Sequence, residues 1–260
     1  MGTAIIQGDV WSGSPHDWAE LQEPLFRPIY EAVLKQAGVR SRQSVLDVGC
    51  GSGLFCNVAA KHGAQVAGID AAPGLIEVAK SRTPSGDFRV GEMEELPFDD
   101  GVFDLVTGFN SFQFASEPAN ALRQAQRVVK PTGKIAMAIW GRAQDCQAAS
   151  VLKALSVILP PPPPGAPGPF ALSEPGVVEN MLLRAGLKPE QSAEADTPFV
   201  FSNDDTACRA FMASGPGILA IRRNGEEKVR ATLMPAVAPF KKPDGSYRME
   251  NKFKFVIAAP

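Results

Sequence analysis

Short apolar runs alternate with helical stretches from Ser44 to Trp140. The runs are four to seven residues long and rich in β-branched and aromatic side chains, which is typical of buried strands, and the stretches between them have the length and composition of helices. The predicted strands are 44–48, 65–69, 87–90, 103–108 and 134–140, and the predicted helices are 54–62, 73–82 and 118–129. Because the connections are short and such crossovers are right-handed, the pattern predicts an α/β fold with a doubly wound, mostly parallel sheet.

The flanking segments carry a weaker pattern. Residues 1–43 are expected to be a polar, loop-rich leader that ends in a helix from about Pro24 to Ala37. Prolines and glycines at 160–169 predict a stiff extended connector. Beyond it the sequence predicts strand-like runs at 197–201 and 252–258 and helices at 174–185, 204–213 and 225–236. No internal repeat is present, so we expect one domain over 1–260 with insertions.

Composition narrows the possible environments and partners. The chain of 260 residues is 45% apolar and has a formal net charge of −2, so no overall positive field attracts nucleic acid or acidic lipid. Its first residues lack a basic segment followed by an apolar core, and no apolar run has the length of a membrane span. Four well-separated cysteines suit neither a zinc site nor a disulfide framework. We therefore expect a cytoplasmic protein with reduced thiols, no metal and no nucleic-acid partner.

The most informative stretch is the glycine turn after the first strand, Asp47-Val48-Gly49-Cys50-Gly51-Ser52-Gly53. Glycines at a strand-to-helix turn let the backbone approach a ligand closely. The spacing differs from Gly-x-Gly-x-x-Gly, and the carboxylate of Asp47 would repel a pyrophosphate at the helix N-terminus. The turn therefore favours a cofactor that lacks phosphate and carries positive charge, such as S-adenosylmethionine.

Two further acidic positions follow later strands. Asp70, with Ala71 beside it, ends the second strand, and a carboxylate there can accept hydrogen bonds from both hydroxyls of a ribose. Glu92 follows the third strand and can accept a hydrogen bond from an adenine amino group. Met93 can offer the ring a backbone N–H and an apolar face.

Together with Leu96-Pro97-Phe98 and Phe103-Asp104-Leu105-Val106, these elements resemble the class I S-adenosylmethionine-dependent methyltransferases, and within them the small-molecule enzymes that include quinone-biosynthesis methyltransferases. The resemblance covers about residues 42–140. Glu92-Met93 departs from the Asp-Ala that the family often has, but conserves the charge. The resemblance implies a Rossmann-like seven-stranded sheet whose last strand, 252–258, runs antiparallel. It also implies a leader (1–43), a cofactor-binding core (44–140) and a C-terminal half (141–260) with a substrate cover at 203–238.

Several residues outside the core are candidates for the site. Ligands bind beyond the carboxyl ends of parallel strands, which places Phe109 and Asn110 near the methionine end of the cofactor and Gln113 near the acceptor. In related enzymes a leader helix closes over the cofactor, so Trp18 and Gln22 are predicted to line its roof. The weak candidates for a catalytic role are His16, Tyr30 and Gln113. Trp140 either lines the acceptor pocket or packs in the core.

The predicted activity is methyl transfer to a small molecule by in-line displacement. Because the methyl group of a sulfonium is already activated, alignment and exclusion of water suffice, and a base is needed only if the acceptor must lose a proton. Two alternatives stay open at this point: a non-catalytic S-adenosylmethionine-binding protein and an NAD(P)-dependent oxidoreductase. The sequence leaves the acceptor, its reacting atom and the oligomeric state undetermined.

Overall fold

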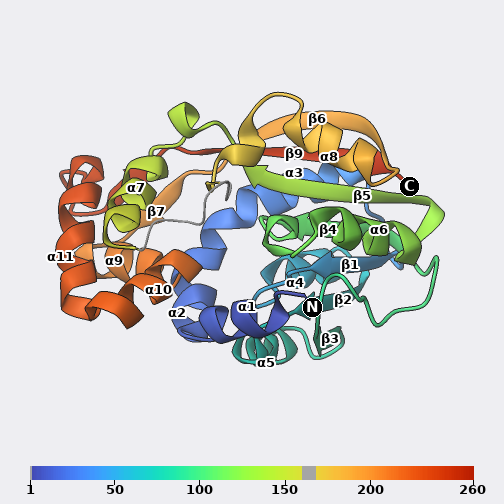
Figure 1. Cartoon of the computed structure of the whole chain (residues 1–260), viewed down its shortest axis with the longest axis horizontal. Coiled ribbons are helices and arrows are strands. Elements are labelled where there is room, and N and C mark those ends of the chain that lie inside the picture. Colours follow the sequence, from blue (N-terminus) through green and yellow to red (C-terminus); the bar gives the residue numbers. More distant parts are fainter. Residues whose placement is uncertain (1, 160–167) are drawn as a thin grey trace.

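The computed structural model describes residues 2–159 and 168–260. The proline-rich connector predicted at 160–169 lies almost entirely outside the described residues. Seven strands form one sheet in the order β3-β2-β1-β4-β5-β9-β6, in which only β9 runs against its neighbours (Figure 1). Their bounds are β1 Ser44–Val48, β2 Gln65–Asp70, β3 Asp87–Val90, β4 Phe103–Phe109, β5 Val129–Trp140, β6 Lys188–Asp196 and β9 Lys252–Ala259. The predicted doubly wound sheet with an antiparallel last strand is confirmed.

Helices cover both faces of this sheet because its strands are apolar on both sides. One face packs against α3 (Arg27–Ala37), α4 (Leu54–Lys61) and α5 (Pro73–Arg82). The other packs against α6 (Pro118–Val128) and α8 (Val177–Arg184). The parallel strands β1 and β4 are neighbours, and the chain leaves them in opposite directions along the sheet. Their carboxyl ends therefore form the switch point at which such sheets bind ligands.

A second group of helices lies beyond the carboxyl ends of the strands, at the left of Figure 1. It comprises α7 (Ala148–Ile158), α9 (Asp204–Met212), α10 (Gly215–Asn224), α11 (Glu226–Val237) and the two-stranded ribbon of β7 (Phe199–Phe201) and β8 (Tyr247–Met249). The leader contacts this group through α1 (Ala4–Trp11), which packs against α10. We call residues 2–26 and 204–237 the cover.

The prediction of a loop-rich leader is wrong, because this segment is helical. After α1 come α2 (Pro15–Asp17), a π-helical turn at Trp18–Gln22 and a 3₁₀ turn at Glu23–Phe26. Helix α1 has no apolar stripe, and Ile5 and Ile6 are exposed on it. Its contacts are tertiary, since the backbone N–H of Ala4 donates to Glu92. Local periodicity therefore gave no sign of it.

Two strand predictions also need correction. The run predicted at 197–201 belongs to the small ribbon, and the sheet is instead completed by β6 at Lys188–Asp196. This edge strand is mostly polar and exposed, so it lacks the apolar run that marks buried strands. Pro131-Thr132-Gly133, a sequence that predicts a turn, lies inside β5, where the register against β4 shifts between Phe103 and Leu105.

Candidate functional site

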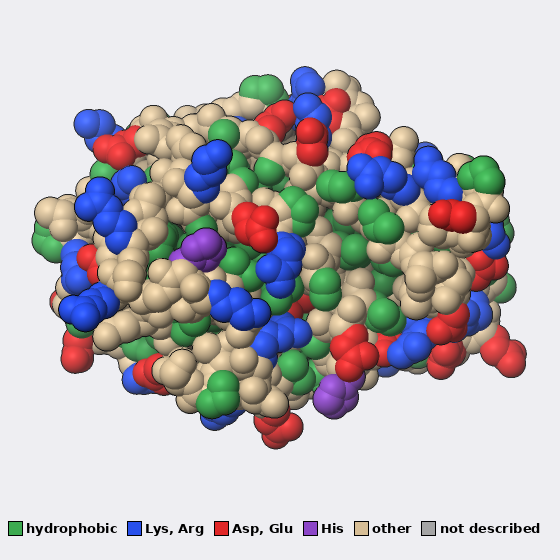
Figure 2. Space-filling view, turned by 180° about the vertical axis from the view of Figure 1, so that it is seen from behind, with side chains coloured by type: hydrophobic (Ala, Val, Ile, Leu, Met, Phe, Trp, Pro, Cys, Tyr) green, Lys and Arg blue, Asp and Glu red, His purple; other side chains and the backbone are tan. Residues whose placement is uncertain are grey.

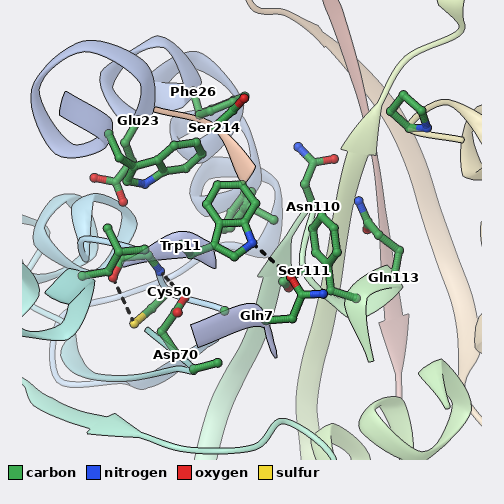
Figure 3. A pocket seen from close by; sticks show the side chains of 18 of the residues that line it. Gln7, Trp11, Glu23, Phe26, Cys50, Asp70, Asn110, Ser111, Gln113 and Ser214 are labelled. Atoms are coloured by element: carbon green, nitrogen blue, oxygen red, sulfur yellow. Dashed lines mark hydrogen bonds between the residues drawn. The ribbon is translucent and has the colours of Figure 1, made fainter. Parts of the chain in front are cut away.

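A cavity of about 510 Å³ lies between the carboxyl edge of the sheet and the cover. This volume is typical of sites for small molecules. The ends of β1, β2, β4 and β5 line one side, and the leader with α7 and the segment 211–216 lines the other. In Figure 3 the side chains of Trp11, Glu23 and Phe26 from the leader and of Asp70 and Asn110 from the sheet edge surround the same space.

The glycine turn places bare backbone against this cavity. Gly49 and Gly51 have φ values of 74° and 54°, and the N–H groups of Gly49 and Cys50 donate to the carbonyl of Ile69. A Cβ added at Gly51 would stand 3.1 Å from Oε1 of Glu23 and 3.2 Å from Nε1 of Trp18. Gly49, Cys50 and Gly51, predicted to bind the cofactor, line the cavity. Gly53 does not belong to the described lining of the cavity. It packs instead against α5, where a Cβ added at Gly53 would meet Ala79.

Two carboxylates at the strand ends also face the cavity. Asp70 accepts hydrogen bonds from the backbone N–H groups of Gly51 and Ala72, both at 2.9 Å. Asp47 is 2% exposed and accepts a hydrogen bond from Oγ1 of Thr107 at 2.7 Å. Burial raises the pKa of Asp70 and raises that of Asp47 well above its ordinary value. Both acids therefore stand where a bound cation would stabilise their charged forms.

Glu92 and Met93 line the same cavity, as does Ala71. Glu92, however, already accepts a hydrogen bond from the leader. Its Oε2 accepts from the N–H of Ala4 at 2.9 Å, and its Oε1 accepts from the N–H of Glu94 at 3.2 Å. Each oxygen keeps a second lone pair for a ligand. Glu92 therefore also ties the first helix of the cover to the sheet.

The end of β4 turns sharply at Asn110. This residue has a φ of 50°, donates its N–H to the carbonyl of Ala138 and accepts from the N–H of Trp140 through Oδ1. A non-glycine residue with this φ is strained, and such strain concentrates at functional sites. Phe109, Asn110 and Gln113 line the cavity, and so does Trp140, whose ring lies 4.5 Å from that of Phe253.

The leader contributes Trp18 and Gln22, predicted to form the roof over the cofactor, and also Tyr30 to the cavity. It also contributes Glu23, which sequence reasoning missed. Glu23 is 2% exposed, accepts hydrogen bonds from Oγ of Ser52 and from Nη1 of Arg82, and so joins the leader to the glycine turn and to α5. Burial raises the pKa of Glu23, and the charge of Arg82 opposes that rise. A single acid before Pro24 gave no signal in the sequence.

The weak catalytic candidates separate in the structure. His16 lies exposed on α2, away from the described lining, so the prediction that it could serve as a base at the site is not supported. Tyr30 faces the cavity, but burial and the nearby acids Glu23 and Asp47 raise the pKa of its phenol well above the ordinary value. Gln113 faces the cavity but cannot act as a base near neutral pH.

Several buried polar atoms around the cavity have no hydrogen-bond partner among the described residues. They are Nε1 of Trp18, Oε1 of Gln22, Oγ of Ser111 and Oε1 of Gln113. Native proteins rarely leave such atoms unpaired, so these four point to a polar ligand. In the described parts of the chain, no cluster of His, Cys, Asp and Glu is arranged to hold a metal ion.

Charge on the surface gives no sign of a polyanionic partner. The segment 222–254 holds nine Lys and Arg against four Asp and Glu, but six of these basic side chains pair with acids, as Arg230 does with Asp205 and Lys241 with Asp204. Figure 2 shows positive and negative side chains interspersed over one face. No helix within 2–159 or 168–260 is both long and apolar enough to cross a bilayer.

Comparison with known proteins shows sequence similarity to methyltransferases. Residues 46–137 match the family model described as "Methyltransferase domain". The chain is 37% identical over 128 residues to a ubiquinone biosynthesis O-methyltransferase of Xanthomonas oryzae, an alignment that covers 47% of this chain and 52% of that protein. It is 38% identical over 106 residues to a demethylmenaquinone methyltransferase of Renibacterium salmoninarum, covering 41% and 45%. The chain thus spans about half the length of the curated relatives that it matches.

Solved structures extend the similarity to most of the chain. A putative methyltransferase from Bacillus halodurans superposes with a TM-score of 0.57 at 18% identity, covering 88% of this chain and 97% of that one. At this identity the likeness concerns the fold alone. The family match at 46–137 contains the glycine turn and the acids of the sheet edge, while the cover lies outside it.

Proposed function

We propose that this chain, whose residues 46–137 match a methyltransferase domain, transfers a methyl group from S-adenosylmethionine to a small molecule. The cofactor would occupy the part of the cavity over β1, β2 and β3. The observation that supports this most is the convergence of Gly51, Asp70 and Glu92 on one cavity.

Each of these residues has a group free for the cofactor. Asp70 would accept hydrogen bonds from the ribose hydroxyls, and Glu92 and Met93 would hold the adenine. The unpaired N–H of Trp18 lies next to the bare backbone of Gly51, where it can donate to the carboxylate of the amino-acid portion. Asp47 lies at the end of β1, where its charge would favour the cationic groups.

The protein's role in such a reaction is positioning. When bound, the sulfonium supplies an activated methyl group. Phe109 and Asn110 at the end of β4 would fix the methionine end, while Trp18, Gln22 and Phe26 of the leader would close the space above it and exclude water. Alignment of this kind can contribute roughly 7–11 kcal/mol to lowering the barrier. No nucleophilic side chain is required.

Calorimetric titration with S-adenosylhomocysteine tests the proposal. We expect micromolar affinity, on the order of −7 to −8 kcal/mol. Asp70→Ala should weaken it by roughly 1–3 kcal/mol, because two hydroxyls lose their acceptor. Asp99→Ala, a change at an exposed aspartate, is the matched control. Equal affinity of the Asp70→Ala protein would remove this residue from the site.

Two further measurements distinguish this function from the two alternatives, an NAD(P)-dependent oxidoreductase and a non-catalytic S-adenosylmethionine-binding protein. Titration with NADH should give no binding, because every charged residue in the described lining is an acid and a pyrophosphate would be repelled. Release of S-adenosylhomocysteine in the presence of acceptors distinguishes an enzyme from a protein that only binds the cofactor.

A further inference from the structure

The cavity has a second part, beyond the ends of β4, β5 and the start of β9, which we call the acceptor half. Trp140 pairs with Phe253 across β5 and β9, and Phe109 pairs with Ala138 across β4 and β5, so the three aromatic residues share one edge. The apolar residues that line this half are Phe26, Ile29, Tyr30, Phe109, Trp140, Leu152, Leu159, Leu172, Phe211 and Phe253. A molecule bound here would contact mainly aromatic and aliphatic side chains.

The charges around the cavity are of one sign. Its four charged residues are Glu23, Asp47, Asp70 and Glu92, and no Lys, Arg or His belongs to its described lining. The segment 160–167 contains only Pro, Gly and Ala, so its side chains can add no cation. Arg82 is engaged by Glu23. An anion in the acceptor half would lose its hydration without gaining a counter-charge from the described lining.

Proton acceptors are equally restricted. Neither imidazole nor lysine lines the described cavity, and Tyr30 stays a neutral phenol. The carboxylates are engaged within the chain, Glu23 by Arg82 and Asp47 by Thr107. A hydroxyl acceptor becomes a good nucleophile only when a base removes its proton, whereas a neutral amine already has a free lone pair.

From these three observations we propose that the acceptor is an apolar amine, methylated on nitrogen. The nitrogen lone pair forms the N–C bond while the electrons of the breaking C–S bond stay on sulfur, so the positive charge passes from sulfur to nitrogen. A secondary amine then releases its proton to water. The neighbouring rings suit this charge, because aromatic faces attract cations. Rings of Phe26 and Phe253 lie 5.4 Å apart, and those of Tyr30 and Phe109 lie 4.6 Å apart.

This inference rests on the proposed function, but the following experiment can fail for the acceptor while cofactor binding succeeds. Protein first saturated with S-adenosylhomocysteine is titrated with three probes of one skeleton: N-methyl-4-phenylbutylamine, 4-phenylbutanol and 4-phenylbutyrate. We expect the amine to bind at least tenfold more tightly than the carboxylate, with the alcohol between them. Equal or tighter binding of the carboxylate, or binding of none of the three, would overturn the proposal. Failure of S-adenosylhomocysteine itself to bind would instead overturn the proposed function.

Methyl transfer to the same probes tests the acceptor atom. With S-adenosylmethionine, we expect transfer to the amine in preference to the alcohol, and a rate at low amine concentration that rises with pH as the free amine loses its proton. Transfer mainly to the alcohol, or to no probe, would contradict the proposal.

A matched pair of variants, one charged and one neutral, tests whether charge controls binding in the acceptor half. Leu152→Lys should tighten 4-phenylbutyrate at least tenfold and weaken the amine, while the neutral Leu152→Met should leave the order of the probes unchanged. Ser156→Lys, at an exposed position, repeats the test if a lysine at the half-buried position 152 prevents folding. An unchanged order in a folded lysine variant would show that charge does not control binding in this half.

Discussion

The sheet edge and the cover build opposite sides of one cavity by different means. At the sheet edge, the polar groups are held within the βα units themselves: two backbone N–H groups bind Asp70, and Thr107 on the neighbouring strand binds Asp47. The cover is joined to the rest by contacts between distant segments. Arg209 pairs with Asp17 at 2.5 Å, where both residues are half-buried, and Arg222 pairs with Asp9 at the surface.

This difference matches how the two sides compare with relatives. The family match covers 46–137, which contains the glycine turn and the acids of the sheet edge. The cover, which supplies Trp18, Phe26 and Phe211 to the cavity, lies outside it. A side built from local turns is fixed by its own sequence motif, whereas a side built from distant segments can change without disturbing the sheet. We infer that the motif of the sheet edge sets the cofactor, whereas the cover adds Phe26 and Phe211 to the acceptor half.

The largest effect should come from filling the space between the two sides. Gly51→Val should reduce S-adenosylhomocysteine affinity by at least 100-fold in calorimetry, because its side chain would stand within the cavity, against Glu23 and Trp18. The control is Gly101→Val, where φ is also positive (64°) but nothing lies within 4 Å. Both variants carry the backbone strain of a positive φ, so only the first should lose binding. Comparable loss in both would show that strain, not the cavity, is responsible.

A smaller effect should follow from loosening the buried attachment of the cover at Glu23. Glu23→Gln leaves Arg82 without its counter-charge, and we expect a loss of roughly 1–3 kcal/mol in the free energy of unfolding, with weaker S-adenosylhomocysteine binding. Denaturant unfolding measures the first and calorimetry the second. Asp9→Asn, which cuts the exposed pair with Arg222, should change neither. If both substitutions behaved alike, burial would not distinguish the two attachments.

The smallest effects should come from Asp47, where stability and cofactor affinity should change with pH in opposite directions. Burial raises its pKa well above the ordinary value, so the folded protein binds more protons than the unfolded chain between the two pKa values. Stability therefore falls as pH rises through that window, and Asp47→Asn should lessen the fall. Glu23 and Asp70, whose pKa values burial also raises, should keep part of the dependence.

The same substitution should weaken binding of S-adenosylmethionine. A cation beside Asp47 favours the carboxylate, so the affinity of the unchanged protein should rise with pH and that of Asp47→Asn should rise less. Thermal unfolding and calorimetry from about pH 5 to about pH 8 check the two trends. Parallel pH dependences of the two proteins would contradict this role for Asp47.

Most site residues at the sheet edge could be predicted because each is adjacent in sequence to a strand end. Gly51, Asp70 and Glu92 follow three successive strands, and parallel strands bring their carboxyl ends together whatever lies elsewhere. Gly53 shows the limit of this reasoning: its conformation was foreseeable, but only the packing of Ala79 shows why it must be a glycine. Glu23 could not be found, because its partners Ser52 and Arg82 are 29 and 59 residues away.

The sequence by itself determined the alternation of strands and helices that makes a doubly wound sheet, and the strand-end residues on one side of the cavity, because period, glycine turns and crossover handedness are local properties. The antiparallel last strand followed only from the family resemblance. Only the tertiary structure decided the form of the cover. Helix α1 has no apolar periodicity and β6 no apolar run, so each is held by partners far along the chain, the former by Glu92 and the latter by β9. Contacts between distant segments leave no pattern in either segment alone, and they determine which side chains meet the acceptor.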